Sequence, residues 1–466
     1  MLFYKEIEKY GESAALIHGA GEQVSYQELA ERADKVGNTV GRRTLVFSMC
    51  KNAVESVVGY VGFLRNDIVP VMLSADIDSS LFASLLDSYH PAYIWAPTGQ
   101  KGVIGEPVYQ DDGYSLYQTG LEEDYTLGEG LSLLLTTSGS TGSPKLVRQT
   151  WKNIQSNTES IVEYLGIVNS DRAITTLPMN YTYGLSIINS HLYQGATVIL
   201  TDATLLDKAF WTLFKEQKAT TFGGVPYTYE ILKKLRFGRM DLPSLRYITQ
   251  AGGKLSKEMA EEFNQICIEK GMKLIIMYGQ TEATARMSYL PWSEAQRKAG
   301  SIGVAIPGGK LTLIDVNGDE ITEPDVVGEM LYKGANVTLG YATHRTELSK
   351  EDENKGVLHT GDMAKRDEDG FFYVVGRKKR FLKIFGNRVN LDEVENLLKK
   401  ESIENVCAGQ DDHLKIYITD PELEKATVDF IVNHTGISRG GFEVRFIDQI
   451  PRNDAGKVLY SALEGK

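Results

Sequence analysis

Apolar residues repeat with helical spacing near the start of the chain and then gather into short runs. Leu29, Ala33 and Val36 would share one face of a helix, and Ser25 has the capping-box spacing from Glu28. The following apolar runs have the length of buried strands, with helical stretches between them. Strands that alternate with helices predict a parallel sheet with right-handed crossovers. We expect strands at residues 44–49, 69–72 and 93–96, and helices at 54–64 and 79–86.

The alternation continues after a polar interval. Residues 98–130 are rich in Gly, Asp and Tyr with weak periodicity, which indicates a surface connection. Three leucines at 133–135 then predict a buried strand of a parallel sheet. These segments predict two α/β lobes. The later lobe is expected to have helices at 152–165, 205–216 and 257–270, and strands at 173–178, 196–201, 220–225, 245–249 and 273–277.

The pattern changes from about residue 300 onward. Short apolar runs broken by Gly and Asp predict a small antiparallel barrel or meander. The basic segment Arg377–Arg380 separates two apolar strands, which is typical of a domain junction, and the residues after it predict the order β-β-α-β-α-β. The predicted fold is α/β. A large domain, 1–376, would contain two parallel-sheet α/β lobes plus a small β-barrel-like subdomain, and 377–466 would form a small mobile α+β C-terminal domain.

Charge and cysteine content narrow the classes of function. The 466 residues carry a formal net charge of −12, which argues against nucleic acid or an anionic membrane surface as a partner. Cys50, Cys267 and Cys407 are far apart and show no disulfide or metal-ligand spacing. The N-terminal residues lack the apolar core of a signal peptide, and no apolar run is long enough to span a membrane. We therefore expect a cytoplasmic protein with buried, inert thiols.

The stretch Leu133–Val147, LLLTTSGSTGSPKLV, passes from an apolar strand into hydroxyls and glycines. Gly139 and Gly142 lack a Cβ atom, so the backbone can bend sharply and approach a ligand closely. The hydroxyl groups and Lys145 can donate hydrogen bonds to phosphate oxygens. The P-loop motif GxxxxGK[ST] is absent. A flexible Ser/Gly linker is the alternative, but a linker is not expected to follow three leucines and end in Pro-Lys.

Four further clusters fall at expected strand ends or turns. Gln250–Lys254 either lets an adenine ring lie against paired glycines or forms an ordinary turn. Met277–Ala283 either offers an aromatic ring, a hydroxyl and a carboxylate to a base, phosphate and Mg²⁺, or is a helix start capped by Thr281. His359–Asp362 either binds ribose hydroxyls or is a common Gly-Asp turn. Asn453–Lys457 is either a functional mobile loop or a solvated one.

The order of these clusters resembles that of one protein family. TTSGSTGSPK is similar to the phosphate-binding signature of the adenylate-forming superfamily, which includes acyl-CoA synthetases, aryl and amino-acid adenylating domains and firefly-type luciferases. YGQTEA, HTGD, GRKKRFLKIFG and PRNDAGKV follow in the order and approximate spacing of that superfamily's later signatures. The resemblance covers nearly the whole chain, since SYQELAERADKVGNTV also looks like the family's N-terminal opening.

The resemblance implies an ATP site with Mg²⁺. Thr281 would contact the α-phosphate, and Glu282 would be the metal ligand. Lys457 would reach the carboxylate and the α-phosphate during the first half-reaction, and Lys379 would be the hinge about which the small domain turns between half-reactions. The implied residues around ATP are Thr137, Ser138, Gly139, Ser140, Thr141, Gly142 and Lys145 at the phosphates, Gly252, Gly253, Tyr278 and Gln280 near the adenine, and Asp362 with Arg377 at the ribose.

The acyl pocket of the family corresponds to the segment around Tyr181, Tyr183 and Gly184, with Tyr227 as a further lining residue. Many acyl-CoA and aryl-CoA ligases carry an aromatic-histidine pair where this chain has Asn-Tyr. The Asp that binds a substrate ammonium group in amino-acid adenylating domains is not found, which disfavours an amino acid. If Arg286 faces the pocket, the acid would carry a second carboxylate or another polar group; otherwise the tyrosines simply pack the lobe interface.

The resemblance thus implies an ATP-dependent acid–thiol ligase. A small carboxylic acid would become acyl-AMP with release of pyrophosphate, and the acyl group would pass to a thiol. The acceptor would be CoA or the phosphopantetheine of an acyl carrier protein. The N-terminal lobe, which supplies part of the CoA nucleotide site in the family, is shorter here than in many acyl-CoA ligases, and this favours considering the carrier protein. A free-standing amino-acid adenylating enzyme and a non-catalytic nucleotide-binding relative are the alternatives. The charged residues Lys457, Glu282 and Asp362 argue against the last of these.

Overall fold

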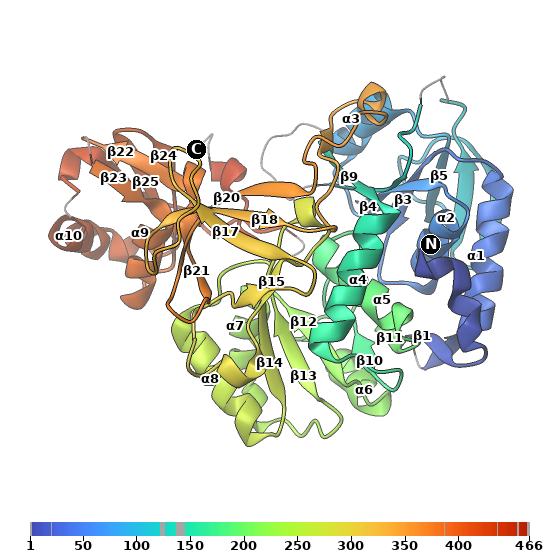
Figure 1. The fold of residues 1–466 in the computed structure, drawn as a ribbon, viewed down its shortest axis with the longest axis horizontal. Helices are drawn as coiled ribbons and strands as arrows, with labels where there is room; N and C mark the ends of the chain where they lie inside the picture. Colours follow the sequence, from blue (N-terminus) through green and yellow to red (C-terminus); the bar gives the residue numbers. More distant parts are fainter. Residues whose placement is uncertain are drawn as a thin grey trace. The chain divides into compact units, whose positions relative to one another are not determined.

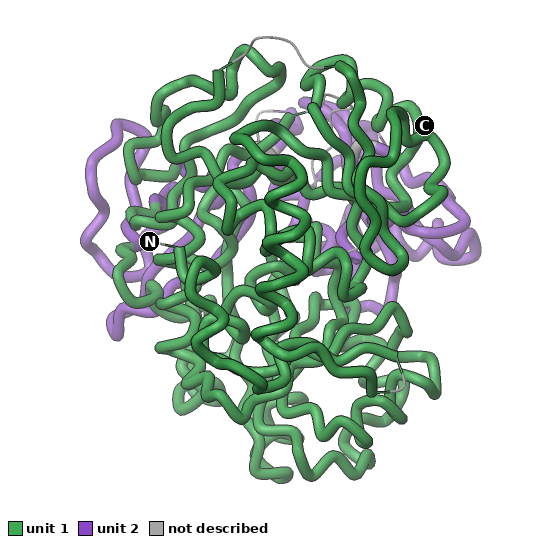
Figure 2. The backbone as a smooth tube through the Cα atoms, turned by 90° about the vertical axis from the view of Figure 1, so that its right-hand side faces the viewer, with its two compact units in different colours: residues 1–137, 142–310, 332–358 green, residues 138–141, 311–331, 359–466 purple. Residues whose placement is uncertain are grey.

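The protein consists of two compact units, each built from helices and sheets (Figures 1 and 2). The computed structural model describes residues 2–19, 21–121, 126–136, 145–385, 387–435, 437–453 and 456–463. Unit 1 comprises residues 1–137, 142–310 and 332–358, and unit 2 comprises residues 138–141, 311–331 and 359–466. The predicted α/β class is confirmed, and the predicted domain boundary at residue 376 stays a prediction.

The first sheet of unit 1 has the strand order β19-β9-β8-β4-β3-β5-β7-β6. Its centre is parallel, because β3 pairs in parallel with β4 and β5, and β4 pairs in parallel with β8. Antiparallel strands flank this centre on both sides. The strands are β3 (Leu45–Cys50), β4 (Val69–Ser74), β5 (Tyr93–Pro97), β6 (Glu106–Asp111), β7 (Tyr114–Gln118), β8 (Leu131–Thr136), β9 (Leu146–Thr150) and β19 (Tyr341–Ala342).

Both faces of this sheet are covered, and strand β3 shows why. Leu45 and Phe47 pack in one core with residues of α3 (Ser79–Tyr89), while Val46 and Cys50 pack in another core with α1 (Tyr26–Val40) and α2 (Val54–Arg65). A strand buried on both faces reads as a continuous apolar run, as in parallel sheets. Ser25 begins α1, as predicted, by accepting a hydrogen bond from the Glu28 backbone N–H.

The second sheet of unit 1 has the strand order β16-β15-β14-β13-β12-β10-β11-β1-β2. The strands from β14 to β1 are parallel, and β15, β16 and β2 extend the sheet through antiparallel pairs. Helices connect the parallel strands. The elements are β1 (Ala14–His18), β2 (Glu22–Ser25), α4 (Trp151–Leu165), β10 (Arg172–Ile174), α5 (Thr182–Tyr193), β11 (Thr197–Leu200), α6 (Lys208–Glu216), β12 (Thr221–Gly224), α7 (Pro226–Lys234), β13 (Tyr247–Gln250), α8 (Lys257–Glu269), β14 (Lys273–Tyr278), β15 (Ser288–Tyr289) and β16 (Val304–Ala305).

The prediction that residues 98–130 form only a surface connection is wrong. They contain the antiparallel pair β6 and β7, which extends the first sheet beyond β5. Most side chains of β6 are exposed because it is the edge strand, so its sequence shows little apolar alternation. Edge strands of this kind leave a weak pattern, and periodicity alone does not detect them.

Unit 2 begins with a small sheet of order β17-β18-β20-β21, at the position of the predicted small β subdomain. Its strands are β17 (Lys310–Ile314), β18 (Gly328–Lys333), β20 (Val357–Arg366) and β21 (Phe372–Arg377). The C-terminal residues form a further α+β layer around one apolar core. That layer contains β22 (Phe381–Ile384), β23 (Asn387–Asn390), α9 (Leu391–Lys400), β24 (Asn405–Gln410), β25 (His413–Ile418), α10 (Glu424–His434) and β26 (Phe442–Phe446).

The predicted C-terminal order lacked one strand, β24. Its apolar run is short and begins with Asn405, so its sequence pattern is weak. The buried Asn405 amide donates to the carbonyl oxygens of Glu395, at 3.1 Å, and Ile403, at 2.9 Å. These two bonds satisfy the amide donors, so a polar residue is tolerated at the start of a buried strand.

Charged side chains fix the segment that follows the predicted hinge residue Lys379. The Arg380 guanidinium lies 2.5 Å from the Asp392 carboxylate and 2.6 Å from the Glu395 carboxylate. Burial alone would lower the pKa of Arg380, but these carboxylates raise it above its usual range. Two hydrogen bonds also tie α9 to strand β21: the Asn390 amide donates to the Val375 carbonyl at 2.9 Å, and the Arg377 backbone N–H donates to Asp392 at 3.2 Å.

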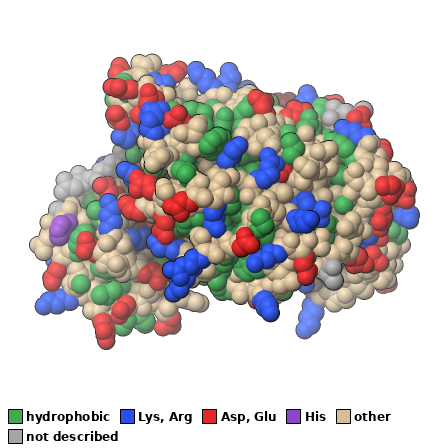
Figure 3. Space-filling model, turned by 90° about the horizontal axis from the view of Figure 1, so that it is seen from below, with side chains coloured by type: hydrophobic (Ala, Val, Ile, Leu, Met, Phe, Trp, Pro, Cys, Tyr) green, Lys and Arg blue, Asp and Glu red, His purple; other side chains and the backbone are tan. Residues whose placement is uncertain are grey.

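The distribution of surface charge and the burial of the three cysteines agree with what the composition predicts. On the face drawn in Figure 3, basic and acidic side chains are interspersed rather than gathered into one basic patch. Among the described residues, no helix is both long and apolar enough to cross a membrane. Burial raises the pKa of Cys50 and of Cys267 to about 12 and that of Cys407 well above its usual value, so all three thiols stay protonated.

Candidate functional site

Two of the predicted clusters, Gln250–Lys254 and Met277–Ala283, lie at one sheet edge of unit 1. Strands β12, β13 and β14 are parallel neighbours, so their carboxyl ends lie side by side, where α/β sheets bind ligands. Gly252, after β13, has φ +80°, a backbone conformation that favours glycine. A Cβ atom at Gly253 would lie 3.0 Å from Pro226 Cγ, and the Gln250 amide donates to the Gly253 carbonyl at 2.8 Å.

The segment after β14 turns back sharply on itself. A Cβ atom at Gly279 would lie 1.6 Å from the Ala285 carbonyl oxygen, so only glycine fits there. Gln280 donates through its amide to the Tyr278 hydroxyl at 3.1 Å. A three-residue 3₁₀ helix runs from Thr281 to Ala283, and it has no side-chain cap. The alternative interpretation of Thr281 as the cap of a helix is therefore wrong.

Two buried asparagines hold this turn from behind. The Asn336 amide donates to the carbonyls of Ala283, at 2.8 Å, and Arg286, at 3.0 Å. The Asn157 amide, from α4, also donates to the Arg286 carbonyl at 2.9 Å. These bonds satisfy backbone carbonyls that the turn leaves without secondary-structure partners. They fix the direction of Glu282, which lies within the turn.

Glu282 belongs to a chain of three polar side chains. The Tyr341 hydroxyl donates to the Glu282 carboxylate at 2.5 Å, and Lys145 Nζ lies 3.3 Å from the centroid of the Tyr341 ring. Burial, and then the adjacent Glu282 carboxylate, raise the pKa of Tyr341 above its usual range, so the hydroxyl remains a donor at neutral pH. The cluster therefore places a carboxylate at the hydroxyl end, and an ammonium group over the face, of one aromatic ring.

Lys145 stands at the edge of the predicted phosphate loop. Strands β8 and β9, which flank that loop, form an antiparallel pair with Thr136 opposite Leu146, and Lys145 directly precedes β9. The loop residues Thr137, Ser138, Gly139, Ser140, Thr141 and Gly142 lie outside the described residues. Strand β19, which carries Tyr341, pairs with β9, and this pairing brings the ring to Lys145.

The predicted acyl-pocket residues divide into a buried and an exposed group. Tyr183, in α5, is 2% exposed, and its hydroxyl lies 2.8 Å from the Thr249 hydroxyl of β13. The Tyr181 ring packs edge-on against Tyr183, and Gly184 is needed because a Cβ atom there would lie 2.3 Å from the Pro178 carbonyl oxygen. Tyr227, in α7, is 39% exposed, so it lies outside the core that contains Tyr183.

The predicted ribose residues pair within unit 2. Asp362 in β20 is buried and lies opposite Arg377 of β21, whose Nε atom is 3.4 Å from its carboxylate. Gly361 has φ +68°, and the Asp362 backbone N–H donates to the Thr360 hydroxyl at 3.1 Å. The turn therefore fixes the carboxylate, while the adjacent Arg377 side chain remains largely exposed.

Lys457 lies on a tight turn of unit 2. Its backbone N–H donates to the Asn453 side chain at 2.9 Å, and its carbonyl accepts from the Asn453 N–H at 2.8 Å. The predicted hinge residue Lys379 lies between β21 and β22, in a short 3₁₀ helix at Lys378–Arg380. The structure thus groups the predicted residues within each unit, with Lys145, Gly252, Tyr278 and Glu282 in unit 1 and Asp362, Arg377, Lys379 and Lys457 in unit 2.

The sequence interpretation missed the residues that position the others. Tyr341, Asn336 and Asn157 fall in no motif of that interpretation. Tyr341 is 59 residues from its partner Glu282, Asn336 is 53 and 50 residues from its two partners, and Asn157 is 129 residues from its partner. The one local signal is Gly340, whose φ of +109° marks a turn just before Tyr341. Contacts between distant residues leave no spacing pattern, so only the fold reveals them.

Comparison with known proteins places the chain in a family. The family model for AMP-binding enzymes matches residues 3–342, more than half of the chain. The indoleacetate–CoA ligase of Aromatoleum aromaticum is 30% identical over 340 residues, covering 70% of this chain and 65% of that protein, just under two thirds of its length. The 2-succinylbenzoate–CoA ligase of Oceanobacillus iheyensis is 25% identical over 94% of this chain and 93% of its own.

Solved structures show the same fold. The O-succinylbenzoate coenzyme A synthetase from Bacillus subtilis, in complex with AMP, aligns with a TM-score of 0.79 at 22% identity and covers 99% of this chain and 98% of its own. The same enzyme has also been solved with ATP and a magnesium ion. The predicted family and the predicted class of acid–thiol ligase agree with these relatives. The chain belongs to the AMP-binding enzymes, the adenylate-forming superfamily of acyl-CoA synthetase-like proteins.

Proposed function

We propose that this protein activates a small carboxylic acid with MgATP as acyl-AMP, releases pyrophosphate, and transfers the acyl group to a thiol. The Glu282–Tyr341–Lys145 cluster supports this most directly. Tyr341 holds one carboxylate oxygen of Glu282, and the other oxygen has no hydrogen-bond partner among the described residues. A carboxylate fixed in this way suits Mg²⁺, which prefers oxygen ligands. Lys145, which lies over the face of the Tyr341 ring, would bind the phosphates.

The first half-reaction joins two anions, and the chain supplies charges suited to that task. Thr281 and Lys457 would contact the α-phosphate, and Lys457 would also neutralise the attacking carboxylate. Bound Mg²⁺ would offset the negative charge of the phosphates. Positioning and electrostatics are sufficient for phosphoryl chemistry of this type, so the proposal requires no covalent nucleophile on the protein.

The nucleotide would be held at the strand edge and by unit 2. Gly252 and Gly253 leave an open backbone against which adenine can lie, and Tyr278 with Gln280 would flank it. Asp362 would accept the ribose hydroxyls with Arg377 beside it. We further propose that residues 377–466 turn about Lys379 as a small domain after adenylation. In the second half-reaction, CoA or a carrier-protein phosphopantetheine in the cytoplasm would then accept the acyl group.

A pyrophosphate-release screen tests the proposed reaction. Purified protein would be offered aliphatic, aromatic and amino acids in turn, with MgATP, and then CoA or holo-carrier protein. We expect acid-dependent pyrophosphate release with at least one non-amino acid, followed by thioester formation. Release with amino acids alone would indicate an amino-acid adenylating enzyme. No release with any acid, together with tight ATP binding, would indicate a non-catalytic nucleotide-binding protein.

Replacing Asp362 should weaken ATP binding. The Asp362→Ala variant loses a charged acceptor for the ribose hydroxyls, and hydrogen bonds to charged groups are worth roughly 1.5–3 kcal/mol. We therefore expect a rise in the ATP dissociation constant of about 10- to 100-fold by calorimetry. The variant Glu368→Gln, at an exposed acidic residue of the same sheet region, should bind ATP normally. Unchanged affinity in Asp362→Ala would remove this residue from the ribose site.

Replacing Tyr341 separates its two contacts. Tyr341→Phe keeps the ring beneath Lys145 but removes the hydroxyl that holds Glu282. The Mg²⁺ concentration needed for half-maximal ATP–pyrophosphate exchange should therefore rise by about 5- to 10-fold, which corresponds to the loss of about one hydrogen bond. Tyr341→Ala removes both contacts and should have the larger effect. Equal Mg²⁺ dependence in wild type and Tyr341→Phe would show that the hydroxyl does not orient the carboxylate.

A further inference from the structure

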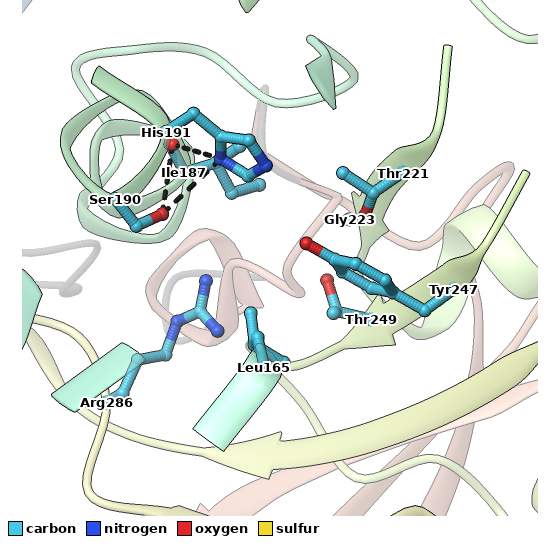
Figure 4. Close-up of a pocket in the computed structure, with 9 residues that line it drawn as sticks. All are labelled: Leu165, Ile187, Ser190, His191, Thr221, Gly223, Tyr247, Thr249 and Arg286. Atoms are coloured by element: carbon cyan, nitrogen blue, oxygen red, sulfur yellow. Dashed lines mark hydrogen bonds between the residues drawn. The ribbon is translucent and has the colours of Figure 1, made fainter. Parts of the chain in front are cut away.

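Arg148 and Arg286 are both fully buried in unit 1, but their partners differ in kind. Arg286 lines a cavity of about 10 Å³, which has room for about one water molecule (Figure 4). Its guanidinium stacks over the Tyr183 ring at 4.4 Å from the centroid and donates to the Ser186 hydroxyl at 3.0 Å. Arg286 therefore packs against neutral side chains, and this cavity is too small for the second carboxylate that the sequence hypothesis allowed. Arg148, in β9, binds the backbone instead.

The Arg148 guanidinium closes the base of a loop that we define as residues 339–353. Arginine has five N–H donors and no acceptor, so one side chain can join several carbonyls. The bond from Arg148 Nε–H to the Tyr341 carbonyl is 3.1 Å long. The guanidinium donates to four carbonyls, two at the start of the loop and two near its end, those of Leu339, Tyr341, Lys350 and Glu351.

The charge of Arg148 is balanced at the same place. Its Nη2 atom lies 2.8 Å from the Glu353 carboxylate, and the Glu353 backbone N–H donates to the Leu339 carbonyl at 3.0 Å. Gly340 leaves room for this ion pair, because a Cβ atom there would lie 2.4 Å from Glu353 Oε2. Since Arg148 is 0% exposed, water does not compete for its donors. One buried side chain and its half-exposed counter-charge therefore fix the base of the loop.

Strand β19, which carries Tyr341, depends on this support. It has only two residues and lies at the edge of its sheet, where Tyr341 pairs with Val147 and Ala342 pairs with Leu146. A two-residue edge strand has few ladder hydrogen bonds, so other contacts must hold the segment. The side-chain bonds of Arg148 add to the pairing at the position of Tyr341 itself.

Tyr341 carries this position to Glu282. Its hydroxyl donates to the Glu282 carboxylate, and Lys145 Nζ lies over its ring. The residue before the loop contacts the same turn, because the Thr338 backbone N–H donates to the Glu282 carbonyl at 3.0 Å. Among the described residues, Arg148 forms no hydrogen bond with the Glu282 carboxylate or with Lys145 Nζ. It can therefore act on these two groups only through the loop.

We propose that Arg148 is a positioning residue for the metal and phosphate site. By closing the base of the 339–353 loop, it holds the Tyr341 hydroxyl against Glu282 and the Tyr341 ring against Lys145. The inference rests on the proposed function, in which Glu282 binds Mg²⁺ and Lys145 binds the phosphates, and it adds a residue that touches neither ligand. Without Arg148 the loop base would open, and Glu282 would lose the fixed orientation that suits Mg²⁺.

ATP affinity with and without Mg²⁺ tests this role. Calorimetry would give the gain in ATP affinity that Mg²⁺ produces in the wild type, in Arg148→Met and in Arg148→Lys. We expect this gain to fall by about 5- to 10-fold in Arg148→Met, as in Tyr341→Phe, because both variants release one hydrogen bond to Glu282. Arg148→Lys keeps the charge but has fewer donors, so it should retain part of the gain. The exposed control Arg239→Met should retain all of it.

A double variant separates positioning from a general loss of stability. If Arg148 acts through the Tyr341 hydroxyl, Arg148→Met should lower the gain in the wild type but not further in Tyr341→Phe, because coupled residues are not additive. Thermal unfolding would show which variants are folded. A residue that only stabilised the fold would lower the unfolding temperature and leave the gain of the folded protein unchanged. That result, or an equal fall in both backgrounds, would overturn the inference.

Glu353→Ala keeps the test decisive if the Arg148 variants do not fold. The Glu353 side chain is half-exposed, so this variant should fold, while the Arg148 guanidinium loses its counter-charge. The gain should fall in the same direction by a smaller factor, and an unchanged gain would overturn the inference. Wild-type ATP binding that Mg²⁺ does not strengthen would contradict the proposed function, and the inference with it.

Discussion

Replacing Lys457 by alanine should slow acid-dependent ATP–pyrophosphate exchange by on the order of 10²–10³-fold, the usual worth of one preorganised charge. The reason is that the proposed first step brings a carboxylate to a phosphate, and the Lys457 ammonium would neutralise both. The proposed second half-reaction would use a different face of the small domain. Transfer from preformed acyl-adenylate to the thiol should therefore remain largely intact in the same variant, measured as thioester formed per enzyme.

Two control variants separate an effect on the reaction from an effect on folding. Lys425→Ala, at an exposed lysine of α10 in the same unit, should change neither step. Lys457→Arg would keep the charge on a longer, planar group and should recover only part of the exchange rate, because the two side chains differ in geometry. Equal loss of adenylation and thioester formation in Lys457→Ala would contradict the role assigned to this lysine.

Replacing Glu282 by glutamine should reduce exchange by about 10²-fold or more, because the variant loses the charge that would hold Mg²⁺. The amide keeps the size of the side chain and can still accept from the Tyr341 hydroxyl, so the turn that carries it should persist. The loss should therefore appear mainly as a higher Mg²⁺ requirement and a lower kcat. Both are measured by titrating Mg²⁺ at saturating ATP and acid.

Glu230→Gln provides the matched comparison. Glu230 is an exposed glutamate of α7, and its replacement should leave the Mg²⁺ titration unchanged. A thermal unfolding curve for each variant would confirm that the protein remains folded. If Glu282→Gln kept the wild-type Mg²⁺ requirement, the metal would have to be bound elsewhere, and the cluster of Glu282, Tyr341 and Lys145 would lose its assigned function.

Much of the fold followed from local patterns. Alternating apolar runs and helical segments predicted the parallel centres of both sheets of unit 1, because buried strands read as continuous apolar stretches. The Gln250–Lys254 and Met277–Ala283 clusters were expected at strand ends, and they follow β13 and β14, which are parallel neighbours. Strands β6 and β24 were missed because their exposed or polar residues weaken the apolar run.

The supporting contacts could not be predicted in the same way. Tyr341 reaches Glu282 only because β19 pairs with β9, and this pairing joins strands almost 200 residues apart. The burial of Arg286 depends on the packing of Tyr164, Tyr183 and Ser186 from two helices. A sequence pattern identifies residues with chemical potential, whereas the fold decides which of them lie together and which charges lack a partner.

The link between α9 and β21 bears on the energetics of the proposed turn about Lys379. One bond from the Asn390 amide and one from the Arg377 backbone N–H join these two elements; the first contributes about 1 kcal/mol, and the second, which ends on a carboxylate, roughly 1.5–3 kcal/mol. Breaking both would cost about as much as two or three substrate contacts supply. The Arg380 ion pairs would meanwhile keep the rotating body rigid. Ligand occupancy alone could therefore select between the two orientations, without drawing on the energy of nucleotide cleavage.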